Sequence, residues 1–444
     1  MNQTTRAWLI PLALLLLMGT AGLALSQTNP SVGGGPVVAA DIAWMLTATA
    51  LVLLMTPGLS FFYGGMVQRK NLVSTMLQSF IAMGVVSLVW VAVGFSLAFG
   101  ESIGGFIGSP LSYLMFRGVG SATHPDLSPT IPLALFAMFQ LKFAIITPAL
   151  ITGAFAERVR FSAYVLFLVL FSVLIYAPLA HATWHPDGLL RQWGVLDFAG
   201  GTVVHMSSGF AALAGAIVLG RRRIHRESGT HTPTNIPYVL LGTGMLWFGW
   251  FGFNCGSALA ASPSAVLAFV TTNTASAAAM LAWLLLDSIS GRKISALGAC
   301  SGTVVGLVAI TPAAGFVTVG QSIVIGIAAG LICNTAARWR MKTKLDDTLD
   351  VFACHGVGGV VGMIATGVFA DKVGLVYGDP TTFLHHLVSV VIVGVFAFGG
   401  SMILYKVTNK LIPLRVEQAE EELGLDLTQH RERADDSGGL RQVA

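Results

Sequence analysis

The sequence predicts an all-α polytopic membrane protein, because it is too apolar for a soluble domain and its apolar runs have the length of a bilayer. Of the 444 residues, 54% are hydrophobic and only 10% are charged, whereas soluble domains carry about 25% charged residues. Runs of about 20 apolar residues, long enough to cross the hydrocarbon as helices, recur along nearly the whole chain. No polar stretch between them is long enough to fold separately, so we expect one membrane domain.

Eleven of these runs are expected to form transmembrane helices, as two groups of five spans and a final span. The runs lie near residues 41–66, 74–100, 131–153, 161–182, 197–219, 238–258, 262–287, 296–313, 319–337, 351–370 and 384–407. We therefore assign residues 27–409 to the membrane domain and residues 410–444 to a polar C-terminal tail.

The N-terminus has the pattern of a secretory signal peptide. Arg6 precedes the apolar run 9–17, and the small-residue sequence at 24–26 comes directly before Gln27. This order of a basic residue, a short apolar region and small residues is typical of a cleaved leader. We expect residues 1–26 to be removed near Gln27, with an uncleaved anchor helix as the alternative.

Lysine and arginine residues are concentrated in alternate loops, which predicts the orientation of the chain. One set of loops carries Arg69, Lys70, Arg158, Arg160, Arg221, Arg222, Arg223, Arg226, Arg292, Lys293, Arg338, Arg340, Lys342 and Lys344, and the intervening loops carry only Arg117, Arg191 and Lys372. Because basic loops remain on the cytoplasmic side, we expect a multi-pass protein of the cell (inner) membrane, with its mature N-terminus outside and its tail inside. The net charge of +4 is spread over short loops, so no nucleic-acid partner is expected.

Short sequence echoes relate the two groups of five spans, whose predicted orientations are opposite. LSFFYGG at 59–65 resembles FGWFGFNCG at 248–256, and ITPA occurs at both 146–149 and 310–313. Matches this short also arise by chance in so biased a composition, but both pairs are offset by five spans. The common offset favours two inverted repeats, which commonly enclose a site near the membrane midplane.

Two histidines, His205 and His355, lie in spans five and ten and share that offset. An imidazole within the membrane is costly and usually faces the bundle interior, on a path for protons, ions or substrate. We expect the rings to meet, with one neutral ring donating N–H to the other and the outer nitrogens contacting a passing molecule. A pair of satisfied core histidines is the alternative. No cysteine or carboxylate has the spacing that would support a metal site.

An acidic residue, Asp197, precedes His205 by about two helical turns, or roughly 12 Å at 1.5 Å per residue. Direct contact between the two side chains is therefore not expected. Asp197 can cap the start of span five, or it can supply negative potential for an approaching cation. Both roles are compatible.

Aromatic residues form the remaining candidate site. Phe143, Trp184, Trp247, Trp250, Phe251 and Phe253 lie near predicted outer helix ends or among the glycines of span six, which suggest a re-entrant segment. Aromatic faces attract cations by about 0.5 to 2 kcal/mol, so a cation can pause there. An interfacial aromatic belt is the alternative.

Six motifs together resemble the ammonium transporter (Amt/Rh) family, in the form typical of bacterial Amt proteins. They are FFYGGMVQRKN at 61–71, ITGAFAERVRFSA at 151–163, LDFAGGTVVH at 196–205, GWFGFNCGS at 249–257, LGACSGTVVGLVAITPAAG at 297–315 and DVFACHGVGG at 350–359. The resemblance extends from about residue 41 to 433, and the combination is highly specific.

The resemblance implies a role for each candidate residue. His205 and His355 resemble the family's twin pore histidines, Phe143 and Phe253 its phenylalanine gate, Trp184 and Ser257 its outer ammonium-recruitment site with Trp250 nearby, and Asp197 its required acidic residue. It also implies a homotrimer with one pore in each subunit, and a cytoplasmic tail through which PII-type signalling proteins can act. No cofactor is implied.

Two residues depart from the family pattern. Lys142 stands beside the presumed gate residue Phe143, where the family commonly has an uncharged residue, and it is expected to point away from the pore or to snorkel. Arg431 stands in the tail where many members have glycine.

The expected function remains a transporter that deprotonates ammonium and conducts ammonia. The alternatives are an ammonium sensor and a channel for a neutral gas or small solute. An enzyme is not expected, because the sequence offers no nucleophile–base constellation.

Overall fold

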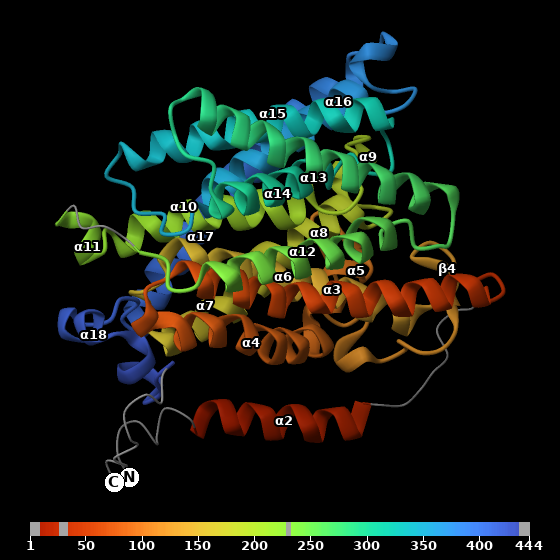
Figure 1. The fold of residues 1–444 in the computed structure, drawn as a ribbon. Coiled ribbons are helices and arrows are strands. Elements are labelled where there is room, and N and C mark those ends of the chain that lie inside the picture. The colour runs from red at the N-terminus through yellow and green to blue at the C-terminus, as the bar shows by residue number, and fades with distance from the viewer. Residues whose placement is uncertain (1–8, 26–33, 228–231, 435–444) are drawn as a thin grey trace.

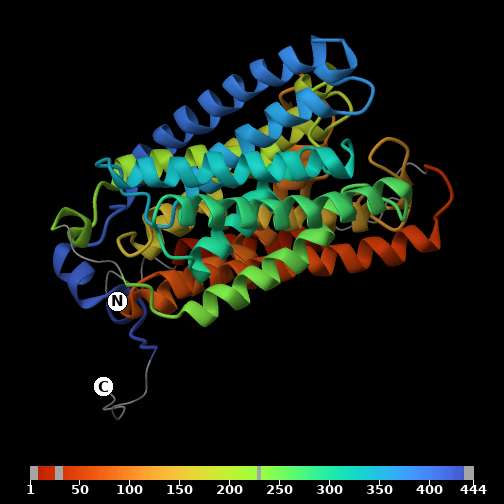
Figure 2. The same cartoon turned by 45° about the horizontal axis from the view of Figure 1, so that its top comes forward.

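The protein is a bundle of long helices whose axes are roughly aligned, as both views of the computed structural model show (Figures 1 and 2). The structure describes residues 9–25, 34–227 and 232–434. The helix α18 marks one end of the bundle and the strand β4 marks the other (Figure 1), and these are called the α18 end and the β4 end.

The long elements include straight helices and helices interrupted by a π-helical turn. In chain order they are α3 (Ala39–Met66); α4 (Leu72–Val89) with η2 (Trp90–Gly94) and α5 (Phe95–Phe99); α6 (Leu133–Phe155); α7 (Phe161–Phe171) with η4 (Ser172–Tyr176) and α8 (Ala177–Trp184); η5 (Gly201–Met206) with α10 (Ser207–Leu219); α12 (Ile236–Gly256); α13 (Pro263–Ile289); α14 (Ala296–Ile310); α15 (Val319–Met341); η6 (Phe352–Val357) with α16 (Gly358–Phe369); and α17 (Thr381–Leu411).

The remaining elements connect these helices or lie near the termini. They are α2 (Leu9–Leu25), η1 (Arg69–Asn71), η3 (Leu114–Phe116), α9 (Leu189–Gln192), α11 (Arg223–Arg226), η7 (Leu375–Tyr377), α18 (Gln418–Leu423) and η8 (Asp426–His430), with two antiparallel strand pairs, β1 (Ser102–Ile103) with β2 (Ile107–Gly108) and β3 (Thr123–His124) with β4 (Ser128–Pro132).

The described residues include ten helices that are long and apolar enough to cross a membrane. The eighth expected span, near 296–313, forms the shorter apolar helix α14, which has 15 residues. The N-terminal apolar run forms α2, but the expected cleavage position near Gln27 lies outside the described residues. The prediction of a helical membrane protein is therefore confirmed, although two short strand pairs in the connections were not predicted.

Spans one and six, α3 and α12, pack against each other through glycines. A Cβ on Gly242 would lie 2.3 Å from the backbone nitrogen of Phe62, and one on Gly58 would lie 2.9 Å from Cβ of Met245. Such close backbone approach is the usual role of small residues between membrane helices. The glycines of span six therefore serve packing inside one unbroken helix, and the re-entrant reading of this segment was wrong.

Spans five and ten also meet at glycine. A Cβ on Gly209, one turn after His205, would lie 2.1 Å from the backbone nitrogen of Gly356. In the opposite direction, a Cβ on Gly359, one turn after His355, would lie 3.1 Å from the backbone nitrogen of Met206. The fourth residue after each histidine thus faces the residue that follows the other histidine, so the contact has approximate twofold symmetry.

A buried ion network joins three loops at the α18 end. The Arg222 guanidinium donates to Glu157 at 2.6 Å and to Asp346 at 2.9 and 3.0 Å, and all three side chains are at most 5% exposed. Burial by itself raises the pKa of the Asp346 carboxyl, but hydrogen bonds from Arg222 and the charge of Arg158 outweigh burial and hold this pKa well below its usual range. The loops after spans three, five and nine are thereby fixed together.

The first part of the C-terminal tail is folded onto the same end. The Asp426 carboxylate accepts hydrogen bonds from the backbone amides of Val73 at 3.0 Å and Ser74 at 2.8 Å, which caps the N-terminus of α4. Lys70 donates to the carbonyls of Glu421 and Glu422. The described part of the tail therefore packs against the bundle.

The substitution Arg222→Met should strongly destabilise the protein. It leaves Glu157 and Asp346 buried without their shared cation, and breaking a buried ion pair on one side costs about 3–5 kcal/mol. A fall in the thermal unfolding midpoint of the purified protein in detergent measures the effect. The control is Arg223→Gln, which removes a neighbouring arginine that is 41% exposed and should leave the midpoint unchanged. Equal effects of both variants would contradict this account of the network.

Candidate functional site

Five rings form a continuous row through the interior of the bundle. From the β4 end, Trp184 meets Phe143 edge-on with ring centroids 5.7 Å apart, and Phe143 stacks on Phe253 at 4.1 Å. Phe253 lies 6.0 Å from His205, which in turn lies 5.4 Å from His355. The row connects α8, α6, α12, η5 and η6, so five separate spans contribute one ring each.

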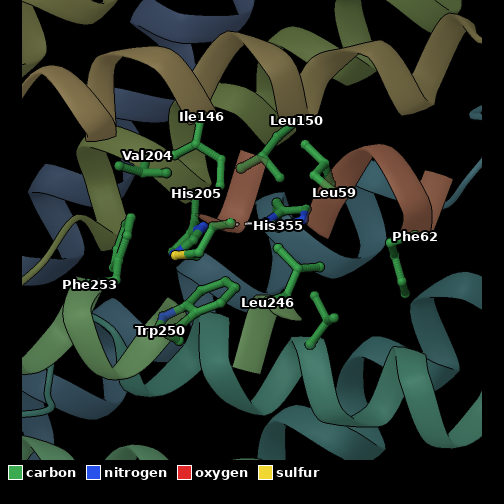
Figure 3. Close-up of a pocket in the computed structure, with 12 residues that line it drawn as sticks. Leu59, Phe62, Ile146, Leu150, Val204, His205, Leu246, Trp250, Phe253 and His355 are labelled. Carbon is green, nitrogen blue, oxygen red and sulfur yellow. Dashed lines mark hydrogen bonds between the residues drawn. The ribbon is translucent and has the colours of Figure 1, made fainter. Parts of the chain in front are cut away.

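The two imidazoles are in direct contact. Nδ1 of His205 and Nδ1 of His355 are 3.3 Å apart, and the residues are 1% and 3% exposed. Each histidine lies in a π-helical turn, η5 or η6, at the start of its span. Turns of this kind are rare and recur at functional sites. The expected meeting of the rings is present, and Figure 3 shows them side by side between Phe253 and Phe62.

Apolar side chains enclose the histidine pair. A cavity of about 10 Å³, the size that one water molecule needs, is lined by Met55, Leu59, Phe62, Ile146, Leu150, Val204, His205, Leu246, Trp250, Phe253, Val304 and His355. A second cavity, of about 130 Å³, extends toward the α18 end and is lined in part by Thr348 and Asp350. Both cavities share Phe62, Val304 and His355, so His355 stands at their junction.

The carboxylate of Asp197 is a hydrogen-bond acceptor for the start of η5. It accepts from the backbone amides of Gly200, Gly201 and Thr202, each at 2.7 Å, and from the Thr202 hydroxyl at 2.5 Å. The capping role expected for Asp197 therefore has a direct structural basis. Four donors around one carboxylate fix both its position and its orientation.

A second aspartate has the same relation to the second histidine. Asp347 precedes His355 by eight residues, as Asp197 precedes His205, and it accepts from the amides of Val351 at 3.1 Å and Phe352 at 2.7 Å. Burial and then the charge of Asp350 raise the pKa of Asp347 to about 6. Asp347 was not predicted from the sequence, although its spacing from His355 is the same as that of Asp197 from His205.

The residues expected at the outer end occupy two different places. The Trp184 indole donates to the Asp197 carbonyl at 3.1 Å, and the Ser257 hydroxyl donates to the Phe253 carbonyl at 2.9 Å, so both lie beside the phenylalanine pair. Trp250 lies deeper, because its ring stacks on His205 at 5.4 Å and lines the smaller cavity. Trp250 therefore lies beside the histidine pair and not beside Trp184 and Ser257.

Thr311 is a further residue that sequence reasoning did not place in the site. It follows α14 in the second ITPA motif, and its hydroxyl lies 3.3 Å from Nε2 of His205 and 2.9 Å from Nε1 of Trp250. The repeated motif was noticed as an echo only. Its position against the histidine pair depends on how the spans pack.

Lys142 does not line either cavity. Its side chain is buried, with the residue 8% exposed. Among the described residues, no group of three or more histidine, cysteine, aspartate or glutamate side chains is arranged to hold a metal ion.

In the described parts of the chain, ten helices long and apolar enough to span a membrane, with a buried pair of imidazoles among them, define a multi-pass membrane protein with a polar site in its apolar core. Residues 43–435 match the model of the Ammonium Transporter Family. The chain belongs to this family.

Individual relatives agree with that assignment. The chain is 47% identical over 403 residues to the ammonium transporter of Bacillus subtilis, covering 89% of this chain and 98% of the relative. Its fold is similar to the crystal structure of Saccharomyces cerevisiae Mep2, with a TM-score of 0.83, 32% identity, and coverage of 90% of this chain and 93% of Mep2. It is also similar to a structure named "Sensor Amt Protein", with a TM-score of 0.81, 32% identity, and coverage of 88% and 98%.

The substitution Asp197→Ala should destabilise the protein by about 2–4 kcal/mol, because it leaves buried amides at the start of η5 without an acceptor. The shift of the thermal unfolding midpoint in detergent measures this cost. Asp187→Ala is the control, since the Asp187 side chain is 71% exposed and its loss should have no effect. A wild-type midpoint for Asp197→Ala would show that the amides find other partners.

The raised pKa of Asp347 predicts a pH dependence of stability. The folded protein holds this proton up to about pH 6, whereas an unfolded aspartate releases it near pH 3.9. The stabilisation from proton uptake is therefore fully present below about pH 4 and is lost as the pH rises through about 6, in total about 1–3 kcal/mol. Unfolding midpoints between pH 4 and 7 should change less steeply in Asp347→Asn, and an unchanged slope would contradict the assignment.

Proposed function

We propose that the protein conducts ammonia across a membrane after ammonium is deprotonated near the phenylalanine pair, its proton passing to water on the side from which ammonium enters. Trp184 and Ser257 recruit the cation, the Phe143–Phe253 pair closes the passage, and His205 and His355 line the path beyond it. The observation that carries the proposal is the row of rings that ends in two touching imidazoles within an apolar cavity. Membership of the Ammonium Transporter Family indicates that the transported solute is ammonium.

The chemistry of ammonium explains why such a passage selects it. Ammonium and potassium have similar charge and size. Moving either ion from water into an apolar cavity costs far more free energy than contacts with the apolar lining can provide. Only ammonium can leave a proton behind and continue as a neutral molecule. An apolar lining interrupted by one pair of imidazoles suits ammonia, because the rings offer hydrogen bonds without requiring a charge.

In this mechanism Asp197 has both of the roles expected from the sequence. Its carboxylate holds the start of η5, which positions His205 five residues after Gly200. Asp197 also lies next to Trp184, whose indole donates to the Asp197 backbone carbonyl. The negative charge of the Asp197 side chain therefore favours a cation beside the phenylalanine pair. The first role concerns the fold and the second concerns ammonium.

We also propose the following architecture for the protein. A cleaved signal peptide at 1–26 precedes eleven spans in residues 27–409, with α14 as the eighth span, and the two groups of five are inverted repeats. The symmetric contact of spans five and ten supports the repeats. The mature N-terminus is outside the cell (inner) membrane, and the protein assembles as a homotrimer with one path in each subunit.

The C-terminal tail, 410–444, is proposed to be a cytoplasmic regulatory segment open to a PII-type protein. The contacts of Asp426 and Lys70 support this role, because they join the tail to the start of α4 and to the loop that precedes it. A partner that binds the tail can thereby act on the bundle.

A second candidate function is an ammonium sensor, and the similarity to the structure named "Sensor Amt Protein" favours keeping it. A channel for a neutral gas or small solute is the other alternative. The two differ from the proposal in measurable ways: a sensor needs little flux, whereas a neutral-gas channel should be insensitive to Asp197→Asn.

The substitution His205→Ala should reduce the selectivity for ammonium over potassium by roughly tenfold or more, because water can then occupy the emptied space and solvate a whole cation. Uptake and current measured together in proteoliposomes test this prediction. His385→Ala, a histidine at the start of α17 outside the site, is the control. Selectivity at the wild-type level in His205→Ala would refute the role of the histidine pair.

A further inference from the structure

We propose that Thr311 is a positioning residue that fixes the tautomer of His205, and thereby makes Nε2 of His355 the one hydrogen-bond acceptor that the pair offers. The inference rests on the proposed function, in which the pair lines the path of ammonia. It concerns the direction of the hydrogen bond between the rings, which neither the family membership nor the contact distance determines.

The Thr311 hydroxyl lies at the centre of three hydrogen bonds. Thr311 is fully buried at the end of α14, and its Oγ1 is 2.8 Å from the Leu307 carbonyl oxygen, 2.9 Å from Nε1 of Trp250 and 3.3 Å from Nε2 of His205. A hydroxyl has one proton to donate and two lone pairs that accept. Three partners therefore use its whole capacity.

The role of each partner follows from its chemistry. The Leu307 carbonyl can only accept, and 2.8 Å is the usual O–H···O distance, so the hydroxyl proton goes to Leu307. The Trp250 indole can only donate, so it occupies one lone pair. The second lone pair faces Nε2 of His205, and two lone pairs would repel at this distance. Nε2 of His205 must therefore carry a proton.

This assignment determines the state of the second ring. A neutral His205 that is protonated on Nε2 has a bare Nδ1, which can only accept. Because Nδ1 of His355 lies 3.3 Å away, it must donate, and a neutral His355 then has a bare Nε2. Within the described part of the chain, this Nε2 has no hydrogen-bond partner, and it belongs to the residue at the junction of the two cavities.

The other half of the bundle has no equivalent anchor. Thr147 occupies the same place in the first ITPA motif, and its hydroxyl donates to the Phe143 carbonyl at 2.7 Å. No hydrogen bond links Thr147 to His355 in the described structure. The pair is therefore held from one side only, and the direction of its hydrogen bond is fixed rather than free to alternate.

The consequence for ammonia is a polarised pair. The outer nitrogen of His205 is already used by Thr311, so it is not available to a passing molecule. Ammonia can donate an N–H to Nε2 of His355, which is the free acceptor next to the larger cavity. This differs from the expectation that both outer nitrogens contact the solute.

Solid-state NMR of the full-length protein, labelled with ¹³C,¹⁵N-histidine and reconstituted in bilayers, tests the tautomers directly. Protonated and bare nitrogens of a neutral imidazole have well-separated ¹⁵N shifts, and coupling to Cδ2 identifies Nε2. Spectra of His205→Asn and His355→Asn assign the two rings. We expect a protonated Nε2 in His205 and a protonated Nδ1 in His355. The opposite tautomers in the wild-type protein would overturn the inference.

Substitutions identify the cause. In Thr311→Val, which keeps the shape but not the hydroxyl, the ratio of Nε2–H to Nδ1–H forms of His205 should fall by about fivefold, the equivalent of one ordinary hydrogen bond. Thr311→Ser should restore the wild-type ratio. Thr147→Val is the matched control and should leave it unchanged. An unchanged ratio in Thr311→Val would overturn the proposal.

Two further measurements separate the possible failures. If Thr311→Val does not fold, Trp250→Phe removes the other donor to the same hydroxyl and should preserve the His205 tautomer, whereas its reversal would assign control to Trp250 and overturn the proposal. Ammonium uptake by wild-type proteoliposomes is measured separately. Absent uptake would refute the proposed function. The NMR tautomers of His205 and His355 test the role of Thr311 independently of that result.

Discussion

The close approach of spans five and ten is the constraint on which the rest of the site depends. The backbones that carry the two imidazoles come almost into contact here, and the rings share a hydrogen bond inside the apolar bundle. Gly209 and Gly356 permit this, because any side chain at Gly209 would collide with the backbone of span ten. Once the helices are this close, each ring satisfies a polar atom of the other, which offsets much of the cost of burying both.

The start of each of these spans is fixed by an aspartate at the same distance from its histidine. Asp197 and Asp347 each accept backbone amides at the beginning of a π-helical turn, so both rings are presented by rigid segments. The approximate symmetry ends at the threonines. The Thr311 hydroxyl contacts His205 and Trp250, whereas the Thr147 hydroxyl donates to the Phe143 carbonyl of its own helix. The twofold arrangement creates the pair, and the departure from it gives the pair a direction.

The meeting of the two histidines and the cap formed by Asp197 were predictable, because polar residues in or beside an apolar run stand out from the composition. A histidine within an apolar run, or an aspartate directly before one, costs free energy to bury in a membrane protein, so its presence indicates a structural or functional role. The placement of Trp250 could not be predicted in the same way. An aromatic residue in a membrane helix suits an interface, a cavity wall or packing equally well, and only the stacking of its ring on His205 decides among them.

The sequence alone determined that the chain is a helical membrane protein, where its apolar helices lie, and which pair of histidines is exceptional, because these properties follow from hydrophobicity and spacing along one chain. Tertiary structure decided which groups share a hydrogen bond. The hydroxyl of Thr311 is 106 residues from His205 in the chain and 3.3 Å away in space. Local patterns contain no information about a contact that arises when separate spans pack, since packing depends on the shapes of all the helices together.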